Sequence, residues 1–92
     1  MRLKPVEYKS LEDFFEARPR IARESMSLHQ LLGGEKASWP FSHAWEEDHE
    51  PITSFFIVFS NPEDDQDFAE IEVHIDLELG LTQCMYTIAR RQ

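Results

Sequence analysis

Apolar and polar positions alternate strictly through residues 69–79, which read A-E-I-E-V-H-I-D-L-E-L. Every odd position is apolar and every even position is ionisable. This pattern is typical of a β-strand with one buried face and one solvent face, because successive side chains point to opposite sides of a sheet. Adjacent positions on one face of a strand lie about 6.6 Å apart. The solvent face therefore carries a row of carboxylates, here called the acidic row: Glu70, Glu72, Asp76 and Glu78.

Two further strands are predicted beside this one. Residues 52–60 are apolar on both faces, which favours a strand covered on both sides. Gly80 predicts a two-residue turn into a strand over 82–90, and such a turn pairs Val73 with Ile88. The three strands form an antiparallel meander.

A helical segment is predicted over residues 10–34. Apolar residues recur there at a spacing of 3.6 residues, Ser10 begins the segment as an N-cap, and Gly33 and Gly34 end it. Pro19 lies inside the pattern, and an interior proline costs a helix about 3 kcal/mol. The segment is therefore either one helix kinked at Pro19 or two short helices.

The remaining two segments show no clear period. Residues 1–9 are expected to form an irregular arm or a short edge strand. Residues 35–51 are expected to form a long loop whose aromatic side chains close one end of the core. The acidic residues of this loop are expected to face water: Glu46, Glu47, Asp48 and Glu50.

These elements predict an α+β fold, in which the N-terminal helical segment packs on an antiparallel β-meander of three or four strands over residues 52–91. The 92 residues are enough for a single domain spanning 1–92. A hydrophobic content of 41% indicates a folded, globular chain despite the net charge of −9.

The charge is distributed unevenly along the chain. Residues 37–89 contain twelve acidic residues and no lysine or arginine, whereas residues 1–36 contain six acidic and seven basic residues. The second segment cannot neutralise itself locally, so we expect it to form a negative surface. This surface would repel nucleic-acid phosphates, so direct nucleic-acid binding is not expected.

The residue types do not favour catalysis or metal binding. Carboxylates on an open strand lack the cleft and the converging geometry that acid–base catalysis needs, and Cys84 is expected to be a small buried hydrophobic residue. No histidine pair has the spacing of a zinc site. We therefore expect neither an enzyme nor a cofactor.

The single cysteine is compatible with a reducing compartment, and no run of residues has the length of a signal peptide or a membrane span. We therefore expect a cytoplasmic protein that does not contact a membrane.

The hypothesis that follows is an inhibitor that binds a basic, nucleic-acid-handling protein and presents carboxylates that mimic phosphates. In size and charge the chain resembles the small acidic inhibitors that phages and mobile elements direct against restriction enzymes or CRISPR complexes. It is also similar in kind to immunity proteins that neutralise nuclease toxins. Both resemblances imply a protein partner, and neither assigns a role to any residue.

The predicted partner-binding residues are the acidic row, two acidic loop segments and an apolar margin. They are Glu70, Glu72, Asp76 and Glu78; Glu46, Glu47, Asp48 and Glu50; Glu63, Asp64, Asp65 and Asp67; and Phe56 and Val58. Two alternatives stay open. One is a homodimer that pairs through Phe56, Val58 and Met85, and the other is a small-molecule or metal-binding module in residues 39–49.

Overall fold

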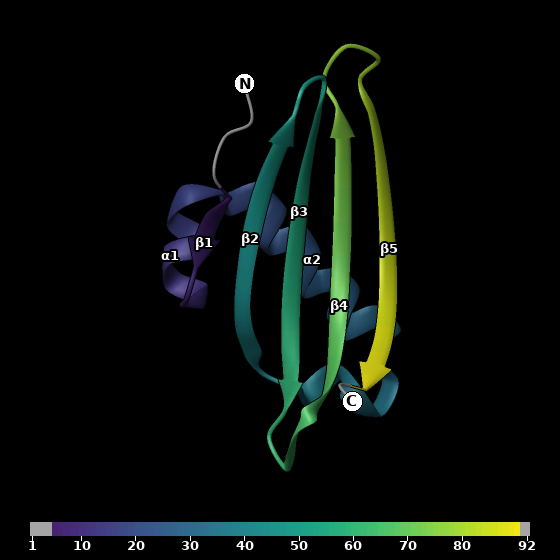
Figure 1. The fold of residues 1–92 in the computed structure, drawn as a ribbon. Helices are drawn as coiled ribbons and strands as arrows, with labels where there is room; N and C mark the ends of the chain where they lie inside the picture. Colours follow the sequence, from purple (N-terminus) through teal and green to yellow (C-terminus); the bar gives the residue numbers. More distant parts are fainter. Residues whose placement is uncertain (1–4, 91–92) are drawn as a thin grey trace.

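The computed structural model describes residues 5–90 and shows one antiparallel sheet with two helices on one of its faces (Figure 1). The sheet contains five strands in chain order, β1 (Val6–Tyr8), β2 (Phe41–His49), β3 (Ile52–Asn61), β4 (Asp64–Asp76) and β5 (Leu81–Arg90). The helices, α1 (Leu11–Ala17) and α2 (Pro19–Leu32), lie between β1 and β2 in the sequence, followed by the 3-10 helix η1 (Gly34–Ser38). The predicted α+β class is confirmed, but the sheet has five strands instead of three or four.

Local sequence signals explain the helical region. The Ser10 hydroxyl accepts a hydrogen bond from the Asp13 N–H at 3.1 Å and caps α1 as predicted. Pro19 occupies the first turn of α2, where its missing N–H costs nothing, so the segment is two helices and not one kinked helix. The described part of residues 1–9 contains the short edge strand β1.

The core lies between the helices and one face of the sheet. Phe14 of α1 and Ala22 of α2 pack over three residues of the central strand, Phe55, Ile57 and Phe59. The opposite face of the sheet has no helix over it among the described residues, and we call it the open face (Figure 1). Strand β3 was predicted to be covered on both sides, but no helix of the described structure covers its second face, where neighbouring side chains alone bury Val58.

The predicted loop over 35–51 is also wrong, because most of it is strand β2. Ala44 and Glu46 point into the core, and Trp45, between them, points to the open face, where it pairs with Phe56 of β3. A charged residue at a core-facing position and a register shift between Phe41 and His43 hide the strand period. As a result, aromatic side chains of this segment lie on both sides of the sheet.

The β4–β5 hairpin has the predicted faces but a different register. Val73 pairs with Cys84, and Ala69 pairs with Ile88, so β5 is shifted by four residues from the expected pairing. The loop is longer than predicted because an Asp76 side-chain oxygen accepts hydrogen bonds from the N–H groups of Glu78 and Leu79, both at 3.0 Å. Gly80, at a φ of 69°, completes the loop.

This shift changes the environment of several residues. Strand β4 ends at Asp76, so the acidic row is interrupted before Glu78. Leu77 and Leu79 are exposed in the turn, and Cys84, which was expected to be buried, is exposed on the helix side of β5. The β3–β4 turn is shorter than the predicted acidic segment over 63–67, because β4 already begins at Asp64. The last residue of the predicted meander, residue 91, lies outside the described residues.

Candidate functional site

The open face is the candidate site, because the strands bring polar and aromatic side chains from distant parts of the chain together there. The register places Glu72 of β4 opposite Phe56 of β3, Phe56 opposite Trp45 of β2, and Trp45 opposite Glu7 of β1. Directly paired residues in a sheet share a face. The row across the sheet is therefore aromatic in its centre and acidic on both sides.

The aromatic side chains form a continuous patch. The rings of Trp45 and Phe56 stack with centroids 4.9 Å apart, and His43 stacks on the other side of Trp45 at 5.6 Å. The ring of His74 meets Phe56 edge-on at 6.0 Å. These contacts hold the patch in one arrangement without a covering layer.

The acidic residues of the open face border this patch. They are Glu7, Glu47, Glu70, Glu72 and Asp76, which the register places on the same side as Trp45. Glu47 accepts a hydrogen bond from the Trp45 indole N–H at 3.0 Å. Burial raises the pKa of Glu70, and the charge of Glu72 raises it further. The carboxylates of Glu70 and Glu72 therefore repel each other on this part of the surface.

A hydrogen-bonded series of polar groups runs beside the patch. The Ser54 hydroxyl lies 2.7 Å from His74 Nδ1, and His74 Nε2 lies 3.2 Å from a Glu72 carboxylate oxygen. A serine, a histidine and a carboxylate are also the components of a hydrolase triad. Ser54, however, is only 6% exposed, and it belongs to a central strand paired on both sides, so its neighbouring backbone N–H groups do not converge on a substrate oxygen. The series orients His74 and Glu72 on the surface.

The remaining predicted site residues lie at the two ends of the sheet or inside it. Asp48, Glu50 and Glu78 lie at or beyond the ends of β2 and β4, at the end of the molecule that contains the β2–β3 and β4–β5 turns (Figure 1). Glu63, Asp64, Asp65 and Asp67 lie at the opposite end, around the β3–β4 turn. Phe56 is on the open face, but Val58 is only 3% exposed there and is covered by its neighbours.

Glu46 is the one predicted site residue that points into the protein, and the expectation that it faces water is wrong. Its side chain is 5% exposed and accepts hydrogen bonds from the Tyr8 hydroxyl and from Arg18, whose Nη2 lies 2.9 Å from Oε2. Burial, together with the hydrogen bond to Glu46, raises the pKa of Tyr8 to about 12. This cluster joins β1, β2 and the start of α2, so Glu46 has a structural role.

A second internal polar contact joins α2 to strand β5 and to Trp39, the residue that follows η1. His29 is fully buried and stacks on Phe59 with centroids 3.7 Å apart. Its Nε2 lies 3.0 Å from the Trp39 carbonyl oxygen and its Nδ1 lies 3.0 Å from the Tyr86 hydroxyl. The carbonyl can only accept, so Nε2 carries the proton and Nδ1 accepts from Tyr86. Burial lowers the pKa of His29, which favours this neutral form.

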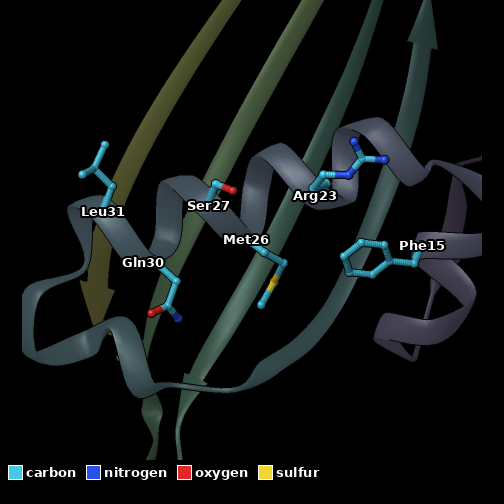
Figure 2. A pocket seen from close by; sticks show the side chains of 6 residues that line it. All are labelled: Phe15, Arg23, Met26, Ser27, Gln30 and Leu31. Atoms are coloured by element: carbon cyan, nitrogen blue, oxygen red, sulfur yellow. The ribbon is translucent and has the colours of Figure 1, made fainter.

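Two of the hollows on the described structure differ in their lining. One, of about 530 Å³, lies on the outer side of the helices and is lined by Phe15, Arg23, Met26, Ser27, Gln30 and Leu31 (Figure 2). It offers one charged side chain and no acid–base pair. The other, of about 360 Å³, lies beside the open face and is lined by Ile52, His74, Asp76, Leu81, Thr82 and Gln83. The second hollow combines a carboxylate with apolar walls.

Three residues of the open face were missed because they belong to segments that were expected to be irregular. They are Glu7, His43 and Trp45. Pro40 and Pro51, which bracket β2, were the available signal, because prolines frequently lie just outside strands.

Within the described residues, no three histidine, cysteine, aspartate or glutamate side chains gather as a metal-binding group. None of the helices seen in residues 5–90 is long and apolar enough to cross a membrane. No protein-family model matches the chain, and comparisons with curated proteins and with solved structures found no match.

Proposed function

We propose that this protein binds a basic, nucleic-acid-handling protein through the open face of its sheet and blocks that partner's nucleic-acid site. The observation that carries the proposal is the composition of the face. The face contains five carboxylates. Strands β2 to β5 come from residues 37–90, and this segment contains no lysine and no arginine except Arg90. An ordinary solvated face mixes both signs of charge.

The electrostatics of Glu70 and Glu72 support this proposal. The raised pKa of Glu70 means that burial and the charge of Glu72 disfavour its ionised form. A basic side chain from a partner would relieve this repulsion, and negative surfaces of this kind attract basic grooves over long distances. The carboxylates thus favour a cationic partner over a neutral one.

The aromatic patch supplies the part of the surface that can contribute affinity. Trp45 and Phe56 present flat rings next to carboxylates, and arginine side chains stack on such rings while pairing with the acids. The hollow beside Asp76 and His74 can take a long basic side chain with an apolar stem. Arginine and aromatic residues dominate the binding energy of many interfaces.

More specifically, we propose that the protein is an inhibitor whose carboxylates take the place of nucleic-acid phosphates in the partner's binding groove. Adjacent acidic positions along a strand are about 6.6 Å apart, and a nucleic-acid binding groove is built to neutralise regularly spaced negative charges. An anti-restriction or anti-CRISPR protein and an immunity protein against a nuclease toxin are the functional classes that fit this surface.

Two other functions are less well supported. A homodimer that pairs through the open face would need Val58 at its surface, and this side chain is buried. A small-molecule or metal-binding module in residues 39–49 would need these residues to form a loop, but most of them form strand β2, whose side chains divide between two faces.

The test compares two double variants with the same change in net charge. Glu70→Lys/Glu72→Lys reverses two acids of the open face, and Glu16→Lys/Glu35→Lys reverses two exposed acids of α1 and η1. The immobilised wild-type chain is used at low salt to isolate a partner from a lysate, and the purified partner is then titrated with each variant and assayed on its nucleic acid.

We expect the open-face variant to bind the partner at least about 100-fold more weakly and to lose inhibition, and the control to stay within about threefold of the wild type. Binding should weaken as salt rises, because screening shortens the range of the attraction. Equal losses in both variants, or a partner without a basic nucleic-acid site, would contradict the proposal.

A further inference from the structure

The two edges of the sheet are built differently. At one edge, β1 has three residues and directly follows Pro5. Short strands and prolines are the usual means by which a protein prevents its edge from pairing with another chain. At the other edge, β5 has ten residues, and no strand pairs beyond it within the described part of the chain (Figure 1).

Strand β5 carries none of the usual protective features before its last residue, Arg90. No charged residue and no proline occurs between residues 79 and 89, and its pairing with β4 shows no register shift. Its sequence is rich in residues that favour strands, including Tyr86, Thr87 and Ile88. An exposed strand of this length and composition is a template for another strand.

Exposed apolar side chains gather along the same edge. Of the nine large hydrophobic residues that are exposed in the described structure, five belong to β5 or to the hairpin that leads into it. They are Leu77, Leu79, Leu81, Met85 and Ile88. Leu31 and Leu32 are two more, and they end α2 close to β5, where His29 contacts Tyr86.

We propose that β5 pairs antiparallel with β5 of a second copy of this chain, which joins two sheets into one of ten strands. Charge selects this occupant. The acidic open face suits a basic partner, whereas the β5 edge is neutral over eleven consecutive positions and gives no advantage to a charged strand. Two chains of net charge −9 can therefore meet at this edge without placing like charges opposite each other.

The same pairing has a defined symmetry. An antiparallel pair of identical strands has its two-fold axis perpendicular to the sheet, so both copies present the same face on the same side. The helices of both copies would lie on one side of the joined sheet, and the two open faces would form one surface on the other. This inference does not depend on the proposed inhibitory function.

The interface is expected to be modest in size. A ten-residue strand is about 33 Å long, and a stable interface typically buries about 800 Å² on each partner. The strand edge alone falls short of this area, and the exposed leucines of the hairpin and of α2 widen it. We therefore expect a dimer that forms at micromolar concentration and dissociates on dilution.

The experiment uses sedimentation equilibrium and a matched pair of variants. Ile88 on β5 and Val6 on β1 are both β-branched and both 50% exposed, but they lie on opposite edges of the sheet. Ile88→Lys adds a charge to the β5 edge, and Val6→Lys adds the same charge to the β1 edge.

We expect the wild type and Val6→Lys to sediment at twice the chain mass at about 100 μM, and Ile88→Lys to dimerise at least about tenfold more weakly with an unchanged far-ultraviolet circular dichroism spectrum. A wild-type chain that stays monomeric at several hundred micromolar overturns the proposal. Equal dimerisation of the wild type and Ile88→Lys also overturns it.

A measurement on the wild type alone covers the case in which a variant does not fold. Hydrogen exchange is compared above and below the concentration of dissociation. Concentration-dependent protection of amides in β5 supports the proposal. Protection confined to β2 or α2, or protection of β5 that appears only when another protein is added, contradicts pairing with a second copy.

Discussion

Glu46 shows how one acidic side chain can differ from its neighbours in the sequence. Glu46 and Glu47 are adjacent, yet the alternation of β2 directs Glu46 into the core and Glu47 to the open face. The inward carboxylate accepts hydrogen bonds from two residues, Tyr8 and Arg18. Burial of a charge is tolerated only with such partners.

Removal of Arg18 tests this role. Arg18→Ala removes two of the three hydrogen bonds that the buried Glu46 carboxylate accepts. We expect a loss of about 2–3 kcal/mol in the free energy of unfolding, measured by urea denaturation. The control is Arg20→Ala, which removes an exposed ion pair with Glu24 and should cost less than about 0.5 kcal/mol. Similar losses in both variants would contradict a special role for the buried cluster.

At the scale of elements, the helix ends and three of the five strands were predictable, because local signals decide them. Ser10 and Pro19 begin α1 and α2, and the alternation of 69–79 identifies β4. The strand β2 was not predictable from its period, because the inward Glu46 is satisfied by residues 28 and 38 positions away. Only the folded chain brings those donors together.

The register of the last hairpin was not predictable for a related reason. The faces of β4 and β5 follow from parity, but the register depends on the number of residues in the loop. Asp76 caps that loop with its own side chain, which lengthens it beyond the two residues that Gly80 suggested. The sequence therefore predicts the acidic residues that β4 contributes to the open face, but not the aromatic residues that β2 contributes.

Gly33, at the junction of α2 and η1, is a position where adding a single methyl group is expected to lower the stability strongly. A Cβ at Gly33 would lie 2.6 Å from the His29 carbonyl oxygen and 2.8 Å from the Ala37 nitrogen, both of which are backbone atoms. Gly34 has a φ of 58° but open space around it.

We expect Gly33→Ala to lower the free energy of unfolding by about 2–3 kcal/mol, because the junction of α2 and η1 must move. Gly34→Ala should cost only about 1–2 kcal/mol, the penalty of a left-handed backbone for alanine. Chemical denaturation of the two variants measures both values, and a larger cost at Gly34 would show that the close approach at Gly33 is not tight.

At the scale of the whole molecule, the two layers carry different charge. All described lysine and arginine residues except Arg90 lie between residues 9 and 36, around the helices, whereas twelve of the eighteen acidic residues lie in residues 37–89. The sheet layer therefore repels itself, and this repulsion lowers the stability of the compact state.

Salt should accordingly stabilise the fold. We expect Tm to rise by about 4–8 °C between 20 mM and 500 mM sodium chloride, equivalent to about 1 kcal/mol for a domain of this size. Glu70→Gln should raise Tm at low salt and reduce the response, because it removes one of two crowded carboxylates. A Tm that is unchanged or falls with salt would contradict net repulsion in the folded state.

The chain order of the sheet also has a consequence for the way the protein folds. Strands β2 to β5 are joined by short turns, so each can find its neighbour after closing only a small loop, at little cost in entropy. Strand β1 pairs with β2 across the whole helical region, so its closure is the one long-range step of the sheet. The hydrogen bonds among Tyr8, Arg18 and Glu46 link β1 to β2, so they stabilise the position of β1 once the helices have packed.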